Sequence, residues 1–464
     1  MILNRGDDKV MQILMRFLAL IACLAMYSCG GGGGTNSEPT SVAIQAPPVF
    51  ESPHPEIWET QPADEAGFNQ ALLSEAFDYA MQDGSFSQAS LLIKDGKLVE
   101  ERYRGITDGE VNALVSRASE PGAKDPKFWR DNYGARDADS LVTSWSTAKS
   151  FTSVLVGIAI EKGFINSTDQ NAADFITEWQ PDARSTITIE QLLDMRSGLA
   201  PACFSETTET LGECEQAADS EAGGNIVFHF DQMTACIDRS LAIDGAAYVW
   251  ARGGSFQSGE FVYSNCDTQV LGEILFRATG QDPATFAQQN LFEPLNISAF
   301  WWRDNVANGQ ANGNYLTYCC IDSTARDFAK FGYLIQLGAL ELEGGREYSN
   351  YISELRSLSD FYGKQFWSFC AETDNSGICL NRVIHTSGFD GQFILIDLRN
   401  QLVIVRASLY KAYLNLSDER KMRLTPGLVS QSNWAGSVPA AMAVPVSSSF
   451  SIREFHSRLI SALQ

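Results

Sequence analysis

The amino-acid sequence predicts a mixed α/β fold in which one antiparallel sheet is built from strands near both ends of the chain. Three observations support this prediction. Strand hairpins occur early and late in the sequence, the long stretch between them has helical periodicity, and a helix-like segment lies beside each hairpin. Terminal strands around a helical middle indicate a sheet with helices packed on its face.

Both hairpins are indicated by alternating apolar segments joined by short turns. Residues 90–94 and 97–103 flank Asp95-Gly96, which is a strong signal for a two-residue turn. Residues 392–397 and 402–406 flank a short polar turn in the same manner. We expect helices at residues 71–81 and 452–463 to pack on the face of the resulting sheet.

The middle of the chain carries three helix signals. A helical apolar pattern begins at Phe151 and ends at Gly163. Thr188 and Gln191 form a capping-box pattern before a second helix. A third helix closes at Gly280. Residues 200–259, between the second and third helices, are polar, acidic and cysteine-bearing. They look like a long excursion that could fold over a pocket.

The bulk composition limits the function. The 464 residues are 44% hydrophobic, which is enough for a large packed core. The formal net charge of −23 argues against a nucleic-acid partner and against docking on anionic lipid, because both need clustered Lys and Arg. Residues 51–464 contain no second linker, so we expect one domain, with the sheet drawn from about 85–140 and 380–410 and a helical region at about 145–370.

The first 50 residues indicate export. Lys9 and Arg16 precede a short apolar run at 17–26, as in a secretory signal. Acidic residues such as Asp7 and Asp8 are unusual at the start of such a signal, so Met11 is an alternative start of the chain. Residues 1–28 followed by Cys29 resemble a bacterial lipoprotein signal with its lipidated cysteine. Residues 29–50 read as a flexible Gly/Ser/Pro-rich linker. The expected location is therefore the bacterial cell envelope, periplasm-facing or on the outer membrane, with membrane contact only through the lipid.

Eight cysteines follow Cys29 in the chain. In an oxidising compartment disulfides are the default interpretation, and eight cysteines allow 105 pairings. Sequence proximity favours Cys203–Cys214 and Cys370–Cys379. A zinc site is the alternative, but the chain has no Cys-x-x-Cys and only four histidines. We expect no metal and no cofactor.

Ser146 and Lys149 form a Ser-x-x-Lys where the apolar helix begins. Positions i and i+3 share a helix face, so the amine can reach the hydroxyl. A serine is a poor nucleophile until a base takes its proton, and lysine becomes such a base when burial lowers its pKa. Ser408 and Lys411 match the same motif without a comparable helix after it. An ordinary helix cap with a surface lysine is the structural alternative for Ser146.

Tyr263-Ser264-Asn265 precedes the third helix and supplies a candidate proton carrier, because a phenol can shuttle a proton to a leaving group. Tyr348-Ser-Asn and Tyr413-Leu-Asn are competing matches. Only Tyr263 is followed directly by a strong helix. Its alternative interpretation is a simple helix cap.

A third element, His385-Thr-Ser-Gly388, comes just before the 392–397 strand. A strand edge there can offer a backbone N–H for an oxyanion, together with the N–H of Ser146. We take Gly388, Asn265 and His385 as candidates for oxyanion or substrate binding. A core histidine bound by hydrogen bonds is the alternative for His385.

Together these segments resemble the serine β-lactamase-like and penicillin-binding family. The segments that carry the resemblance are SWSTAKSFTS at 144–153, ITIEQLLDMRSGL at 187–199, FVYSN at 261–265, FEPL at 292–295 and ARDFAKFG at 325–332. It runs from about residue 57 to the C-terminus. It is nearest in character to the 6-aminohexanoate-dimer hydrolases and class C-like esterases, through SWSTAK and SGFDGQ at 387–392.

The resemblance implies a β-lactamase/transpeptidase-like fold, with an antiparallel sheet flanked by helices plus a mostly helical subdomain. It implies acyl transfer at Ser146, with Lys149 and Tyr263 moving protons and a small ester or amide as substrate. Penicillin-recognising members have Lys-Thr-Gly where this chain has His385-Thr-Ser, which weakens the case for β-lactamase activity. A non-turnover sensor or binding protein, a true β-lactamase and a peptidoglycan peptidase stay open as alternatives.

Overall fold

The protein is described here from a computed structural model, which describes residues 58–117, 124–200, 231–242, 247–248, 254–255, 257–304, 313–342, 345–409, 423–424 and 449–464. All of these belong to one compact unit, residues 51–464. Predictions that fall on the signal, Cys29, the linker, the pair Cys203–Cys214, Lys411 and Tyr413 lie outside the described residues. So does most of the expected excursion at 200–259.

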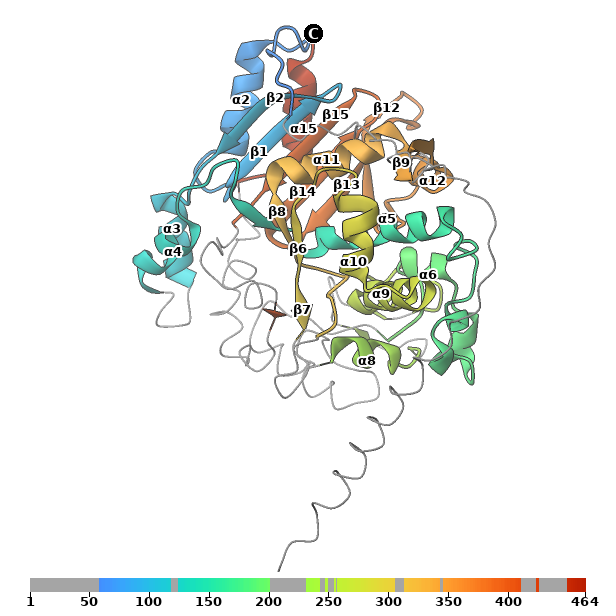
Figure 1. Ribbon diagram of the computed structural model, residues 1–464. Coiled ribbons are helices and arrows are strands. Elements are labelled where there is room, and N and C mark those ends of the chain that lie inside the picture. Colours follow the sequence, from blue (N-terminus) through green and yellow to red (C-terminus); the bar gives the residue numbers. More distant parts are fainter. Residues whose placement is uncertain are drawn as a thin grey trace, which may run out of the picture. The chain divides into compact units, whose positions relative to one another are not determined.

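A seven-stranded sheet lies between two layers of helices (Figure 1). Its strand order is β11-β12-β13-β14-β15-β1-β2, and every neighbouring pair is antiparallel. The strands are β1 (Ala89–Lys94), β2 (Lys97–Tyr103), β11 (Tyr362–Gly363), β12 (Phe366–Thr373), β13 (Cys379–Gly388), β14 (Gln392–Asp397) and β15 (Leu402–Ala407). The pairing of β15 with β1 joins the two ends of the chain, as the sequence predicts.

The first hairpin follows the predicted turn chemistry. Asp95 and Gly96 have φ angles of 51° and 77°. Two successive positive φ values are typical of the type I′ turn, whose twist matches that of the flanking strands. Strands β1 and β2 therefore pair across a two-residue turn, with a register shift between Leu92 and Ile93.

Helices cover both faces of the sheet. Helices α2 (Gln70–Ala80) and α15 (Ile452–Ala462) pack on one face through an apolar cluster that includes Phe77 and Phe455. Helix α11 (Ala325–Leu337) packs on the other face against β14 and β15. A Cβ on Gly332 of α11 would come within 2.5 Å of Val403, so glycine permits this close approach.

The helical region lies on the α11 side of the sheet (Figure 1). Helix α5 (Ala148–Glu161) is buried along most of its length and packs against α9 (Asn265–Thr279). Thr188 and Gln191 make the predicted capping box of α6 (Ile189–Leu193), and Gly280 ends α9 with φ 73°. The other α-helices are α3 (Asp108–Arg117), α4 (Pro126–Tyr133), α8 (Gln232–Ile237), α10 (Pro283–Ala287) and α12 (Asn350–Arg356).

A second, three-stranded sheet includes the strand that ends just before Ser146. It has the order β3-β8-β6, from β3 (Leu141–Thr143), β8 (Ile321–Thr324) and β6 (Ala299–Trp301). The remaining short strands are β4 (Ala247–Tyr248), β5 (Gly254–Ser255), β7 (Arg303–Asp304), β9 (Ala339–Leu342), β10 (Gly345–Tyr348) and β16 (Arg423–Leu424). Single turns complete the elements at η2 (Trp145–Thr147), η3 (Ala172–Asp174), η4 (Thr177–Trp179), η5 (Ala183–Thr186), η7 (Gln288–Phe292) and η8 (Phe389–Gly391).

Two regions differ from the sequence prediction. Part of the 85–140 region assigned to the sheet forms helices α3 and α4, which bury Val111, Trp129 and Tyr133 in a separate apolar cluster. The 145–370 region assigned as helical also supplies β11 and the start of β12 to the main sheet. Within the described residues no helix is long and apolar enough to span a membrane.

Candidate active site

Ser146 lies in the turn η2, between β3 and α5, and its side chain is partly exposed. The preceding residue, Trp145, has φ 47°, which an L-residue rarely adopts. Ser144 holds this turn in place: its N–H donates to Ile321 O, and its Oγ accepts from Ile321 N, both at 2.8 Å. A non-glycine residue held at positive φ is a feature that clusters at functional sites.

Lys149 lies one turn further along α5 and is only 1% exposed. Its Nζ is 3.2 Å from Ser146 Oγ. It is also 2.8 Å from Asn265 Oδ1 and 2.8 Å from the backbone oxygen of Tyr318. Among the described residues no carboxylate pairs with it. Burial therefore lowers the pKa of Lys149 well below its ordinary value.

These three contacts define the orientation of the amine. A neutral lysine has two N–H donors and one lone pair. Asn265 Oδ1 and Tyr318 O can only accept, so they take the two N–H groups. The lone pair is then left facing Ser146 Oγ, which is the geometry needed to accept the serine proton.

Tyr263 is the second side chain that contacts Ser146. Its hydroxyl forms a hydrogen bond with Ser146, and Lys149 Nζ lies 4.9 Å from the centre of its ring. Burial raises the pKa of Tyr263 above its ordinary value, so the phenol keeps its proton at neutral pH. The ring stacks on Trp367 at a centroid distance of 5.7 Å. The Ser146 hydroxyl thus has an amine of lowered pKa and a protonated phenol within reach.

Gly388 lies against the segment that carries Ser146. A Cβ at this position would be 2.2 Å from Ser144 O, so only glycine fits. Next to it, Thr386 Oγ1 is 3.1 Å from Thr147 Oγ1. Strand β12 pairs with β13 no further than His385, which leaves the edge at 386–388 unpaired with β12. The predicted strand edge beside Ser146 is therefore present, with Gly388 at its end.

The structure does not bring His385 to the site. Side chains alternate between the two faces of a strand, and Thr386 already faces Thr147. His385 therefore points the opposite way, with its ring 5.6 Å from that of Phe369 and 6.1 Å from that of Phe393. Burial lowers its pKa to about 4. The structure therefore places the His385 ring on the face of β13 opposite to Thr386, and a role for His385 in binding substrate stays a prediction.

Asn265 occupies the site, but its oxygen faces Lys149 rather than a position for substrate. The sequence also missed Tyr318, whose contribution is a backbone oxygen that any residue type could supply. Gln232 is a second omission, since its Oε1 accepts from the Tyr318 hydroxyl at 2.7 Å. Only the adjacent pair Cys319-Cys320 marked that segment as unusual in the sequence.

Two serines of the competing motifs, Ser408 and Ser349, make structural hydrogen bonds. Ser408 is fully buried, and its Oγ donates to Phe86 O at 3.2 Å while its N–H donates to Gln392 Oε1. Ser349, in the second Tyr-Ser-Asn, caps helix α12 by accepting from Ile352 N at 3.2 Å. Neither serine is placed beside a lysine amine within the described residues.

Aromatic side chains flank the serine on two sides. Trp145 lies 6.3 Å from Trp302 and 6.3 Å from Phe389, measured between ring centroids. On the side of Tyr263, a second group consists of Phe261, Phe361, Tyr362 and Trp367, and Phe361 is 45% exposed. Among the described residues, no group of three His, Cys, Asp or Glu side chains could hold a metal ion.

Comparisons with known proteins identify the family of the chain. The family model described as Beta-lactamase matches residues 74–412. The 6-aminohexanoate-dimer hydrolase of Paenarthrobacter ureafaciens is 25% identical over 319 residues, covering 64% of this chain and 71% of that protein.

The chain is also similar to solved structures. A protein of Bacteroides dorei DSM 17855, provisionally named a β-lactamase, superposes with a TM-score of 0.50 at 15% identity, over 76% of this chain and 93% of its own. The class C β-lactamase of Rhodobacter sphaeroides has a TM-score of 0.45 at 15% identity, over 76% and 97% of the two chains.

Proposed function

The chain belongs to the Beta-lactamase family, and we propose that it is a serine hydrolase that cleaves an ester or amide through an acyl-enzyme on Ser146. The observation that carries this proposal is the position of Lys149. It is a buried amine with two neutral acceptors, no carboxylate partner among the described residues, and a distance of 3.2 Å to Ser146 Oγ. A lysine held in this way is suited to remove the serine proton rather than to support the fold.

In the first half-reaction the Ser146 proton passes to Lys149 Nζ as Oγ attacks the substrate carbonyl carbon. The carbonyl oxygen becomes an oxyanion, which the backbone N–H groups of Ser146 and Gly388 would hold. The bond to the leaving group then breaks, and Tyr263 gives the departing alcohol or amine its proton. Lys149 returns a proton to Tyr263, which leaves an acyl group on Ser146 and both carriers in their starting forms.

Water completes the reaction. A water molecule loses a proton to the same carriers as it attacks the acyl carbonyl, and Ser146 leaves with that proton. The products are a carboxylic acid and an alcohol or amine. The proton carriers in both half-reactions are the two side chains that contact Ser146, namely Lys149 and Tyr263.

Three substrate classes need to be distinguished, and one panel separates them. We expect p-nitrophenyl esters of short acids to be turned over, small amides more slowly, and a chromogenic cephalosporin poorly. Ser146→Ala should abolish all of these activities. A specificity constant for the cephalosporin above that for the simple esters would restore the β-lactamase interpretation.

A neutral, apolar substrate fits the surroundings of Ser146 best. The aromatic groups near Ser146 offer apolar contact, and His385, which stands where penicillin-recognising relatives have a lysine, faces away from the side of Thr386 and Thr147. A matched pair of substrates, one with a free carboxylate and one with its methyl ester, tests this at low and high salt. We expect a preference for the methyl ester, and any part of it that comes from repulsion by the acidic residues at 200–259 should decrease with salt. A preference for the carboxylate would contradict it.

We further propose that the chain is exported and anchored through lipid on Cys29. The sequence of the first 29 residues supports this proposal. The mature protein should begin at Cys29 and partition into detergent. Recovery in the cytoplasm with free thiols throughout would contradict it.

A further inference from the structure

The two oxygen atoms that hold the Lys149 amine both lie beside disulfides. Asn265, whose Oδ1 accepts from Nζ, is followed directly by Cys266, which is bonded to Cys236 at an S–S distance of 2.07 Å. Tyr318, whose backbone oxygen also accepts from Nζ, is followed directly by Cys319, which is bonded to Cys320 at 2.11 Å. All four cysteines are buried, with exposures from 0 to 5%.

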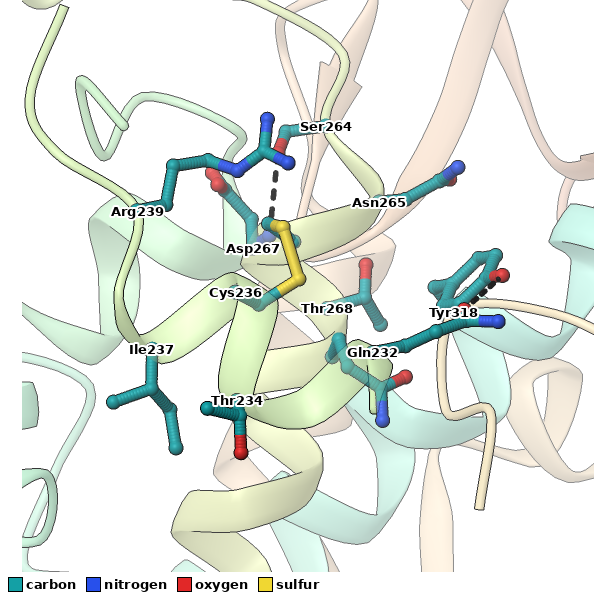
Figure 2. Close-up of a disulfide and its surroundings, with 12 residues drawn as sticks. Gln232, Thr234, Cys236, Ile237, Arg239, Ser264, Asn265, Asp267, Thr268 and Tyr318 are labelled. Atoms are coloured by element: carbon teal, nitrogen blue, oxygen red, sulfur yellow. Dashed lines mark hydrogen bonds between the residues drawn. A yellow bond between two sulfur atoms is a disulfide. The ribbon is translucent and has the colours of Figure 1, made fainter. Parts of the chain in front are cut away.

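Helix α8 connects the two acceptor segments (Figure 2). Cys236 on α8 carries the disulfide to Cys266 at the start of α9. At the other end of α8, Gln232 Oε1 accepts from the Tyr318 hydroxyl at 2.7 Å. The amine therefore depends on two segments that are far apart in sequence and that are held together by one short helix.

The Cys319-Cys320 turn also contacts the segment that carries Ser146. Cys320 N–H donates to Trp145 O at 3.2 Å, and its own oxygen accepts from Trp302 N at 2.9 Å. Cys320 has φ 71°, a value that L-residues rarely adopt. A bond between neighbouring cysteines closes a small ring that restricts this backbone. The turn is thereby fixed on both the lysine side and the serine side.

We propose that the disulfides Cys236–Cys266 and Cys319–Cys320 position the Lys149 amine, so that the enzyme is fully active only when these four cysteines are oxidised. This inference rests on the proposed function of Ser146 and Lys149. Reduction would let the two acceptors move independently. The lone pair of Lys149 would then lose its fixed direction toward Ser146, and a displacement of about 1 Å in such a geometry costs on the order of 100-fold in rate.

Opening each disulfide is a two-electron reduction. A water-soluble phosphine attacks one sulfur and breaks the S–S bond, and water supplies an oxygen atom and two protons. The products are two thiols and one phosphine oxide for each disulfide. Oxidation of the thiols by a disulfide-containing reagent restores the bond and reduces the reagent to its thiols.

The chain offers a matched control in Cys370–Cys379, which the structure bonds at 2.07 Å. Cys379 begins β13, whereas Gly388, beside the Ser146 segment, ends it. Both cysteines are partly exposed, so the phosphine should reduce this pair first. Loss of the control disulfide should leave the turnover number nearly unchanged.

The experiment compares three paired variants of the full chain with the wild type: Cys236→Ser with Cys266→Ser, Cys319→Ser with Cys320→Ser, and Cys370→Ser with Cys379→Ser. The readouts are kcat, KM and the pH dependence of kcat/KM on a p-nitrophenyl ester. For each of the first two we expect kcat to fall by roughly 10- to 100-fold with KM little changed. Water reaching Lys149 should return its pKa toward the ordinary value, so the acid limb of the pH profile should move to higher pH.

Reduction of the folded wild type keeps the test decisive if a variant does not fold. Samples taken during phosphine treatment are alkylated, assayed and mapped by peptide mass. Of the six cysteines that the structure describes in disulfides, only Cys370 and Cys379 should be labelled while activity persists. Activity should fall as the four buried cysteines become labelled and return on reoxidation.

Three results would overturn the inference. These are equal losses in all three pairs, loss that follows labelling of Cys370 and Cys379, and full activity after the four buried cysteines are reduced. A wild type that hydrolyses no substrate while Ser146 resists a fluorophosphonate would remove the proposed function and this inference with it. If the wild type is active and the first two paired variants, at Cys236/Cys266 and Cys319/Cys320, are as active as the wild type, only this inference is removed.

Discussion

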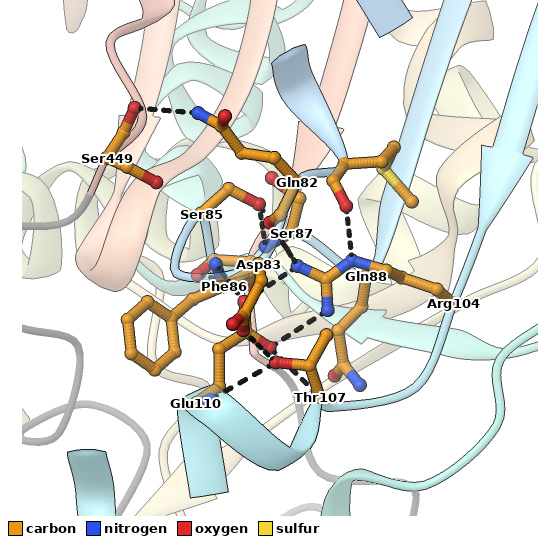
Figure 3. Close-up of polar contacts among 12 residues, drawn as sticks. Gln82, Asp83, Ser85, Phe86, Ser87, Gln88, Arg104, Thr107, Glu110 and Ser449 are labelled. Carbon is orange, nitrogen blue, oxygen red and sulfur yellow. Dashed lines mark hydrogen bonds and ion pairs between the residues drawn. The ribbon is translucent and has the colours of Figure 1, made fainter. Parts of the chain in front are cut away.

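Lys149 and Glu110 are both buried ionisable side chains, but their surroundings differ. Lys149 meets three oxygen atoms of neutral groups and no carboxylate among the described residues. Glu110, which is 0% exposed, has a full set of donors: Arg104 Nη1 and Nη2 at 2.9 and 2.7 Å, Phe86 N at 2.6 Å and Thr107 N at 3.1 Å (Figure 3). Arg104 balances the charge of the Glu110 carboxylate, whereas no opposite charge pairs with the Lys149 amine among the described residues.

The Arg104 guanidinium explains why the Glu110 cluster is structural. Besides Glu110, it donates to the backbone oxygens of Met81, Gln82 and Gly105 and to Ser85 Oγ, at 2.9 to 3.0 Å. Such a network ties the end of α2, the start of β1 and α3 into one corner, and it has no donor left for another molecule. A buried charge with every partner in place holds the fold, whereas a buried amine without a counter-charge is available to exchange a proton.

Replacement of the lysine should give the largest effect on activity. Lys149→Ala should lower kcat by about two to four orders of magnitude, because the serine then lacks its base. Lys330, a buried lysine that pairs with Asp327 at 2.8 Å, provides the matched control, and Lys330→Ala should affect stability rather than kcat. Steady-state kinetics and thermal unfolding of both variants separate the two outcomes. Similar kcat losses in both would contradict the comparison.

The pH profile of the wild type tests the same lysine. Ser146 needs the neutral amine, and burial lowers the pKa of Lys149. The value of kcat/KM should therefore rise with pH through that lowered pKa and level off well below the ordinary lysine range near pH 10.5. A profile that keeps rising up to pH 10.5 would mean that an ordinary, solvated lysine controls the reaction.

Removal of the phenol should have an effect of similar size. Tyr263→Phe keeps the ring on Trp367 but deletes the hydroxyl that contacts Ser146, and kcat should fall by about two to four orders of magnitude. Tyr348→Phe, from the second Tyr-Ser-Asn, should be close to wild type. A large loss at Tyr348 with none at Tyr263 would show that the wrong motif was selected.

Removal of Glu110 should lower the stability of the protein rather than its kcat. Glu110→Ala leaves the partly buried Arg104 without its partner, and because breaking a fully buried pair typically costs about 3–5 kcal/mol of unfolding free energy, we expect a loss of up to about that size. The folded fraction should keep a kcat close to that of the wild type. Denaturant unfolding and active-site titration measure the two quantities. A stable Glu110→Ala variant with low kcat would contradict the structural role.

Asp267 is a third case, in which burial raises the pKa to about 7 from an ordinary value of 3.8. Between these values the folded state keeps the proton and the unfolded state releases it. The unfolding free energy should therefore fall as pH rises from about 4 to 7, by at most about 1.4 kcal/mol per pH unit. Asp267→Asn should remove this slope. The same slope in wild type and variant would contradict the assignment.

Local patterns predicted much of this fold. Asp95-Gly96, the Thr188/Gln191 capping box and the glycine stop at Gly280 all depend on neighbours within a few residues, and each is present. The side of β13 on which His385 lies could not be predicted, because strand alternation shows only that His385 and Thr386 face opposite ways. It was the contact between Thr147 and Thr386 that fixed which of the two faces Ser146.

The surroundings of Lys149 were the least predictable. The Ser-x-x-Lys spacing indicated that Lys149 reaches Ser146, but the backbone oxygen of Tyr318 comes from a residue 169 positions away and leaves no side-chain signature. The choice of Ser146 over Ser408 depended on the helix that follows, and the structure gives Ser408 a buried hydrogen bond to Phe86. Long-range contacts of this kind require the assembled fold.

The most direct test of the account is covalent labelling of the nucleophile. The folded, oxidised protein is treated with a fluorophosphonate, and its peptides are mapped by mass spectrometry with the Lys149→Ala variant in parallel. The account predicts one adduct, on Ser146, which forms far more slowly in the variant. An adduct on Ser408, on another serine, or on none would contradict it.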